Sequence, residues 1–82
     1  MSIEVRYFAG AAAAAGTDAE RLDVPEGSTV TDLLGRIARE RPALVPVLEV
    51  ASVLVDEVAV RDRSQAVHDG AQVDVLPPFA GG

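Results

Sequence analysis

The chain begins with an alternation of apolar and charged residues. Ile3, Val5 and Tyr7 are separated by single charged residues, and a period of two is typical of a strand with one buried face. The pattern therefore predicts a first strand with these three side chains toward a core. By the same parity Phe8 points to the other face, which is an unusual place for one of only two phenylalanines.

Four more short apolar runs bounded by turn residues predict further strands at 21–24, 52–55, 58–60 and 72–76. The first of these follows the opening strand closely, so we expect an antiparallel hairpin whose wide loop holds the alanines 11–15 as a helical turn or loop. Segments 52–55 and 58–60 are either two strands or one bent strand. In the last strand, Val73 and Val75 are expected to point inward, and Asp74 and Leu76 outward.

One clear helix is predicted in the middle of the chain. Thr29 can cap it, with Asp32 completing a variant of the capping box. Apolar residues then recur at helical spacing: Val30, Leu33, Leu34, Ile37 and Ala38. The helix should end before Pro42, with a solvated, arginine-rich last part: Arg36, Arg39 and Arg41. Gly35 is unfavourable inside a helix, and we interpret it as allowing close packing.

These elements predict an α+β domain. Segment 43–50 is apolar but contains Pro46, so it should cover the core rather than form a central strand. We expect a mixed sheet of about four to five strands with one main helix packed on one face. Residues 1–76 would form this domain, and residues 77–82 an extended tail.

Composition narrows the chemistry. The 82 residues contain no cysteine, and the seven Lys+Arg residues are all arginine. Disulfides, thiolate metal sites, phosphate-binding lysines and Schiff bases are therefore excluded. The net charge of −6 disfavours nucleic acid and anionic membranes as partners and favours a protein with a basic surface. No apolar stretch is long enough to span a membrane, so we expect a cytoplasmic protein.

No side chain has the context of a catalyst. His68 is the only histidine and lies in a predicted turn, so we interpret it as a surface residue rather than a metal ligand. The acidic residues show no spacing for a carboxylate pair or a calcium loop. The serines lack a nucleophile-elbow motif. We therefore expect no metal site and no catalytic residue.

The C-terminal sequence is the most informative segment. It reads Leu76-Pro77-Pro78-Phe79-Ala80-Gly81-Gly82. Two prolines stiffen the exit from the sheet, and two glycines can pass through a channel too narrow for other residues. The terminal carboxylate becomes an electrophile once it is activated, for example as an acyl-adenylate. A frayed chain end and a cloning scar are the alternatives to a functional tail.

Three segments carry a resemblance to a known family. They are residues 5–9 with the small residues up to Gly16, residues 27–34 at the start of the helix, and residues 69–82. In these the chain resembles the MoaD/ThiS family of ubiquitin-like sulfur carriers, most closely the branch that supplies the small subunit of molybdopterin synthase. The resemblance implies a β-grasp fold. Gly81 and Gly82 match the family's double glycine, and Pro77 and Pro78 its Pro-Pro.

The resemblance also implies a function. An E1-like adenylating enzyme would use ATP to activate the carboxylate of Gly82, and a sulfurtransferase system would convert it to a thiocarboxylate. The tail, with Phe79, Ala80 and Gly81 before the modified Gly82, would then enter the large subunit of molybdopterin synthase. There it would give sulfur to cyclic pyranopterin monophosphate. The chain would be a non-catalytic subunit, in a heterotetramer, with no bound cofactor.

Two departures from the family pattern affect the partner surface. The first short helix has only alanines where an Arg-Glu pair is usual, and Val55-Asp56-Glu57 replaces a frequent Val-Asn-Gly or Val-Asn-Gln turn. Neither departure touches the tail chemistry. Other functions also stay open. They are a sulfur carrier for thiamine thiazole or cysteine biosynthesis, a protein modifier attached through the C-terminal glycine, and an interaction domain without tail chemistry.

The first and last strands are neighbours in a β-grasp fold, which groups the outward-facing apolar residues. We expect Phe8 and Leu76 to lie together on the sheet's outer face, next to Pro77, Pro78 and Phe79. An exposed apolar group of this kind is typical of a docking site. Scattered exposed apolar residues are the alternative.

Overall fold

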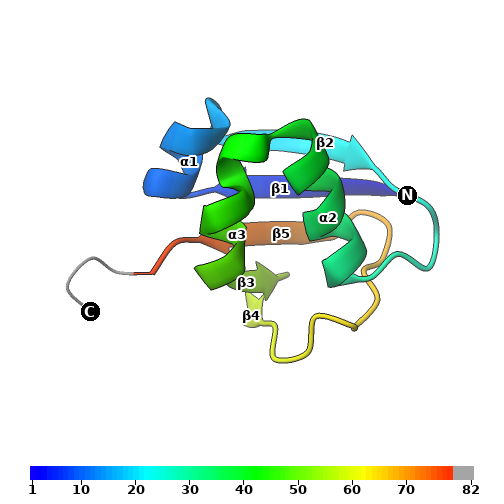
Figure 1. The fold of residues 1–82 in the computed structure, drawn as a ribbon. Helices are drawn as coiled ribbons and strands as arrows, with labels where there is room; N and C mark the ends of the chain where they lie inside the picture. Colours follow the sequence, from blue (N-terminus) through cyan, green and yellow to red (C-terminus); the bar gives the residue numbers. More distant parts are fainter. Residues whose placement is uncertain (79–82) are drawn as a thin grey trace.

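The computed structural model describes residues 1–78 of the 82. Its centre is a five-stranded mixed sheet in the order β2-β1-β5-β3-β4 (Figure 1). Strands β1 and β5 are parallel, and every other neighbouring pair is antiparallel. The strands are β1 (Ser2–Tyr7), β2 (Ala19–Asp23), β3 (Ser52–Val55), β4 (Val58–Ala59) and β5 (Gln72–Leu76). The predicted α+β class and the β-grasp fold are both confirmed.

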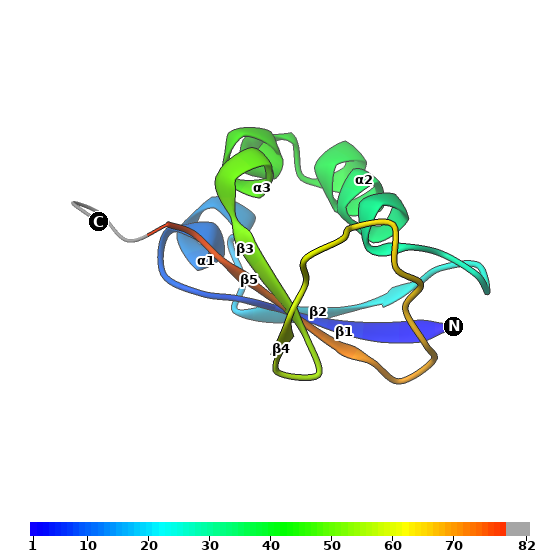
Figure 2. The same ribbon diagram turned by 90° about the horizontal axis from the view of Figure 1, so that it is seen from below.

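All the helices lie on one side of the sheet, and the other side carries none among residues 1–78 (Figure 2). They are α1 (Gly10–Ala15), α2 (Val30–Glu40), the short 3₁₀ helix η1 (Pro42–Leu44) and α3 (Val45–Val50). This leaves an inner face that packs on helices and an outer face that does not. None of these helices is long and apolar enough to cross a membrane, as far as residues 1–78 are concerned.

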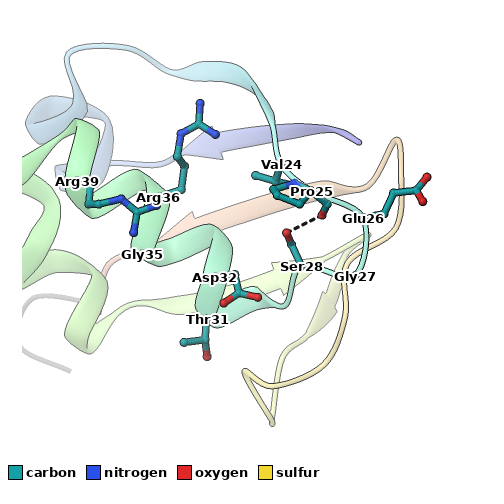
Figure 3. A pocket seen from close by; sticks show the side chains of 10 residues that line it. All are labelled: Val24, Pro25, Glu26, Gly27, Ser28, Thr31, Asp32, Gly35, Arg36 and Arg39. Atoms are coloured by element: carbon teal, nitrogen blue, oxygen red, sulfur yellow. Dashed lines mark hydrogen bonds between the residues drawn. The ribbon is translucent and has the colours of Figure 1, made fainter.

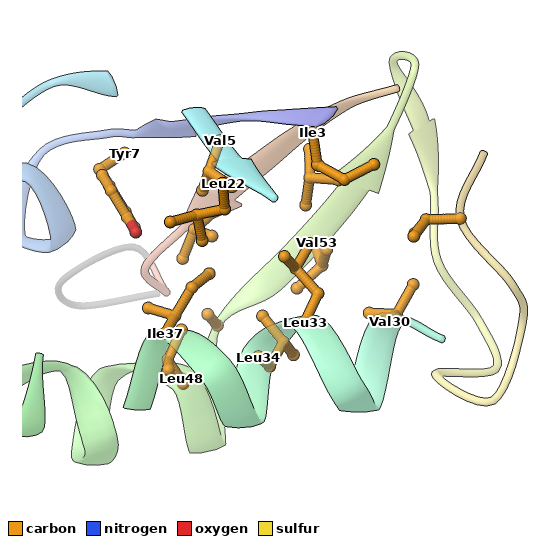
Figure 4. Close-up of a cluster of buried hydrophobic side chains, with 14 of the residues drawn as sticks. Ile3, Val5, Tyr7, Leu22, Val30, Leu33, Leu34, Ile37, Leu48 and Val53 are labelled. Atoms are coloured by element: carbon orange, nitrogen blue, oxygen red, sulfur yellow. The ribbon is translucent and has the colours of Figure 1, made fainter. Parts of the chain in front are cut away.

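The core lies between the inner face and α2 (Figure 4). Ile3, Val5 and Tyr7 are 0–3% exposed, so the predicted alternation of the first strand is confirmed. Val73 and Val75 of β5 and the apolar stripe of α2 meet them, all buried. Because one face of each element carries nearly all its large apolar residues, burying that face fixes the strand register.

The start of α2 has the predicted capping box. The backbone N–H of Asp32 donates to Thr29 Oγ1 at 3.1 Å, and the Asp32 carboxylate accepts from the backbone N–H of Thr29 at 2.9 Å. The helix ends at Glu40, and Arg41 caps it before Pro42. A single well-defined helix therefore crosses the core-facing side of β1 and β5.

Segment 43–50 covers the core as expected, but as helix. Pro42 and Pro46 lie in the first turns of η1 and α3, where a missing N–H costs nothing. Leu44 and Leu48 are buried. Arg63 donates to the carbonyls of Leu48 and Ala51 at 3.2 and 2.9 Å, which satisfies groups left open at the end of α3.

The segments 52–55 and 58–60 form a hairpin rather than one bent strand. Asp56 and Glu57 connect β3 to β4 with φ of 48° and 70°. Positive φ at both central residues is the geometry of a tight hairpin turn, and it is usually filled by Asn-Gly. Asp56 and Glu57 thus adopt the turn conformation that the usual family residues favour, and the hairpin closes despite the departure.

Candidate functional site

The tail begins at the end of a central strand. β5 lies between β1 and β3, and its parallel pairing with β1 directs its last residue away from the end where β1 starts (Figure 1). Leu76 is followed by Pro77 and Pro78, which lengthen this exit. The predicted modification site Gly82 and the predicted tail residues Phe79, Ala80 and Gly81 lie outside the described residues.

A pocket of about 540 Å³ lies beside this exit. We call it the Phe8 pocket, and it is lined by Phe8, Ala9, Gly10, Ser52, Leu76, Pro77 and Pro78. It brings together the four residues predicted to dock a partner: Phe8, Leu76, Pro77 and Pro78. Their docking role stays a prediction. The alternative that they are scattered over the surface is wrong, because all four line one pocket. Ser52 was missed, although it pairs with Leu76 between β3 and β5.

Phe8 is held outward by an unusual backbone turn. Ala9 has φ 49° and ψ −124°, a conformation that L-residues other than glycine adopt at a cost on the order of 1–3 kcal/mol. The first N–H groups of α1 hold the turn, because Ala11 donates to the carbonyl of Phe8 at 2.9 Å. The chain therefore reverses directly after Phe8, and its side chain, 37% exposed, forms one wall of the pocket.

An ion pair lies next to the pocket on the outer face. Arg6 Nε and Nη2 donate to the two carboxylate oxygens of Asp74 at 2.9 and 3.1 Å. Asp74 was predicted to face outward, and it does, yet it is only 3% exposed. The hydrogen bond to this carboxylate, opposed by partial desolvation, raises the pKa of Arg6. Opposite charges at outward positions of adjacent strands were the sequence signal for this pair.

A second polar cluster anchors α1 on the inner side. Arg41 binds the Glu20 carboxylate through Nε at 2.8 Å and Nη2 at 3.1 Å, and also donates to the carbonyl of Ala15. The hydroxyl of Tyr7 donates to the same carboxylate. Burial, more than this carboxylate, raises the pKa of Tyr7, whereas the hydrogen bond from Arg41 lowers the pKa of Glu20. Interpreting Arg41 as a solvated helix end was wrong, because strand β2 brings Glu20 to it.

Gly35 borders a second pocket, of about 460 Å³, between α2 and the loop after β2 (Figure 3). The interpretation that Gly35 allows close packing was wrong. A Cβ there would meet only the Arg39 side chain within 4 Å, at 3.9 Å. Arg36 and Arg39 border the same pocket, and Arg36 also pairs with Glu40 at 3.1 Å. This surface is polar and lies on the helix side, away from the start of the tail.

His68 is at the surface, as predicted, but it is paired. Its Nε2 lies 2.6 Å from Asp56 Oδ2, and Asp56 Oδ1 accepts from the backbone N–H of Gln72 at 3.0 Å. The carboxylate raises the pKa of His68, and the hydrogen bonds from Gln72 and His68 lower the pKa of Asp56. No group of three potential metal ligands occurs among residues 1–78.

This pair predicts a pH-dependent contribution to stability. Because folding raises the pKa of His68, the contribution is complete below the unfolded value of about 6.5 and declines as the pH rises through the folded value. On the acid side it is lost as the pH falls through the lowered pKa of Asp56. The difference in Tm between wild type and His68→Gln should therefore be larger near about pH 5.5 than near about pH 8. An equal difference at both would contradict the pairing.

Comparisons with known proteins agree with this geometry. Residues 5–82 match the model of the ThiS family. The chain is 32% identical over 83 residues to the molybdopterin synthase sulfur carrier subunit of Chlamydomonas reinhardtii, with 100% of both chains covered. It is 29% identical to the human protein of the same name, covering 98% of this chain and 93% of that one. SAMP1 from Haloferax volcanii superposes with a TM-score of 0.89 at 30% identity, with both chains fully covered.

Proposed function

Because this chain belongs to the ThiS family, we propose that it is the sulfur carrier subunit of a molybdopterin synthase and not itself a catalyst. The observation that carries the proposal is the end-to-end match to two sulfur carrier subunits. A match over the full length includes the strand β5 and the segment that follows it. The chain's own chemistry fits, since it has neither cysteine nor lysine and the terminal carboxylate is its one candidate for a covalent role.

The proposed reaction takes place on the carboxylate of Gly82. A carboxylate oxygen attacks the α-phosphorus of ATP in the active site of an E1-like enzyme, and pyrophosphate leaves. Sulfide supplied by a sulfurtransferase system then attacks the activated carbonyl carbon and AMP leaves, which gives a thiocarboxylate. In the large subunit the thiocarboxylate sulfur bonds to cyclic pyranopterin monophosphate, and water then attacks the acyl carbon, so that the sulfur stays on the substrate and the Gly82 carboxylate is restored. We place these steps in the cytoplasm.

The outer face supplies the proposed docking site. An apolar side chain of the large subunit would enter the Phe8 pocket, and the same surface would meet the activating enzyme earlier in the cycle. Pro77 and Pro78 have restricted φ, so they favour an extended course from the pocket toward Phe79 and Ala80. The net charge of −6 favours basic residues on both partners. A heterotetramer with the large subunit is the proposed assembly.

A second function is favoured by a specific observation. The similarity to SAMP1, with a TM-score of 0.89, is as extensive as the similarity to the sulfur carriers. Another crystal structure from the same organism gives the name of SAMP1 in full as small archaeal modifier protein 1. As a modifier, the chain would be attached to other proteins through Gly82. Without lysine it could not extend a chain on its own side chains. Sulfur supply for thiamine thiazole or cysteine is the remaining alternative.

Intact-mass spectrometry of the protein from its native host tests the proposal. A carrier should show a fraction heavier by the exchange of one oxygen for one sulfur, and it should copurify with a molybdopterin synthase large subunit. Attachment to other proteins without that mass change would favour the modifier. An unmodified terminus in cells that are making molybdopterin would contradict the carrier function.

A further inference from the structure

One guanidinium contacts the Phe8 ring on one side of the Phe8 pocket and binds a residue of the strand that forms the other side. Arg6 of β1 stands opposite Asp74 of β5 in the parallel register and binds its carboxylate through two hydrogen bonds. The Arg6 Cζ atom also lies 5.3 Å from the centroid of the Phe8 ring, within the range of a cation–π contact. Phe8 forms the β1 side of the pocket and Leu76, two residues after Asp74, the β5 side. The side chain therefore links the two sides.

Stability alone does not account for this ion pair. Asp74 is 3% exposed, and desolvating a carboxylate is costly even when it is paired. Although Arg6 is partly exposed, replacing the pair by apolar residues of similar volume should cost little stability, because the desolvation penalty of the buried carboxylate is removed with it. An apolar pair at these positions would also extend the apolar pocket. The chain instead has a charged pair there, next to the apolar side chain of Phe8.

The guanidinium also has donors that the fold does not use. Two of its five N–H groups bind Asp74, and it makes no further hydrogen bond within residues 1–78. Its side chain is 39% exposed. Because the guanidinium lies over the Phe8 ring, a partner that covers this ring would cover the guanidinium too, and a covered donor without an acceptor is costly. The partner must therefore bring an acceptor to Arg6.

The local charge indicates what kind of acceptor fits. The two hydrogen bonds to Asp74 already pair the single positive charge of Arg6 with one negative charge, so the ion pair is neutral as a whole. A carboxylate from the partner would be repelled by Asp74. A neutral acceptor, such as a main-chain carbonyl, would not.

We infer that Arg6 is a positioning and specificity residue of the Phe8 pocket. Through Asp74 and the ring of Phe8 it fixes the pocket's two sides, and it selects a partner that places a main-chain carbonyl beside the apolar side chain entering the pocket. The inference rests on the proposed function, with the large subunit of molybdopterin synthase as the partner.

The test removes the pair without leaving a charge behind. The variant Arg6→Met with Asp74→Leu should fold with a Tm close to that of the wild type. Its binding to the host's large subunit should be about tenfold weaker. The loss should be the same at low and high salt, because the hydrogen bond that the variant cannot make goes to a neutral acceptor. The χ1 couplings of Phe8 in the unbound protein should show several rotamers in place of one.

A second ion pair on the same face is the matched control. Glu4 and Arg21 pair across β1 and β2 at 3.7 Å, but it is the guanidinium of Arg6, not that of Arg21, that lies over the Phe8 ring. Glu4→Leu with Arg21→Met should bind like the wild type. The inference is overturned if the Arg6–Asp74 variant binds as tightly as this control with an unchanged Phe8 rotamer, and its neutral-acceptor part is overturned if the loss disappears at high salt. A wild type that does not bind the large subunit overturns the proposed function itself.

Discussion

A chain lacking Gly82 is expected to fold normally and to accept no sulfur. One residue spans about 3.3–3.6 Å of extended chain, so the deletion would withdraw the terminal carboxylate by about that distance from the enzyme that activates it. Reacting groups must meet within about 3–3.5 Å, and a misplacement of about 1 Å can cost about 100-fold in rate. We therefore expect the sulfur-bearing mass to fall at least about 100-fold in protein from the native host.

A substitution of the same tail that keeps its length is the control. Ala80 occupies a variable position in the resembled family, so Ala80→Ser should acquire sulfur like the wild type. Both changes lie beyond β5, which ends at Leu76, so neither alters a core residue. Both variants should therefore have the Tm of the wild type. Sulfur on the shortened chain at the wild-type level would show that neither Gly82 nor the length of the tail matters.

The elements that could be predicted from the sequence are those fixed by local rules. The capping box at Thr29 and Asp32 depends on residues three positions apart, and the first strand depends on a period of two. Helix α3 was missed because Pro42 and Pro46 normally argue against helix, and their position in the first turns was not visible without the boundaries. The inward and outward side chains of the first and last strands were predicted in the same way, whereas the register between strands is known only from the structure.

How much of the candidate site could be predicted depended on knowing which strands are neighbours in the sheet. The pairing of β1 with β5 came from the resemblance, and it placed Phe8 near Leu76. The roles of Arg41 and Gly35 were misjudged because both depend on tertiary neighbours: Glu20 reaches Arg41 from β2, and the space beside Gly35 is open except for Arg39. The burial of Asp74 was missed because no helix covers the outer face, where an outward residue would be expected to be exposed. The side chain of Arg6 binds its carboxylate there.

Phe8→Asp is expected to weaken binding to the large subunit strongly while leaving the fold intact. Phe8 is 37% exposed and lies on the outer face, so the core of Ile3, Val5 and Tyr7 stays filled. In the proposed complex, however, a carboxylate would replace the aromatic wall of the Phe8 pocket and would be buried against an apolar side chain. Truncating a central aromatic residue of an interface commonly costs about 2 kcal/mol or more, and a buried charge adds to that cost.

We therefore expect the dissociation constant to rise at least about 30-fold, measured by calorimetry with the host's large subunit. Val58→Asp is the matched control, because Val58 is an exposed apolar residue, 69% accessible, that does not line the pocket. It introduces the same charge into the same sheet and should leave binding unchanged. If the two variants bind alike, the outer-face pocket is not where the partner docks, whatever happens at Gly82. The pocket and the tail can thus be tested separately, since the proposed function assigns association to the pocket and the later chemistry to the tail.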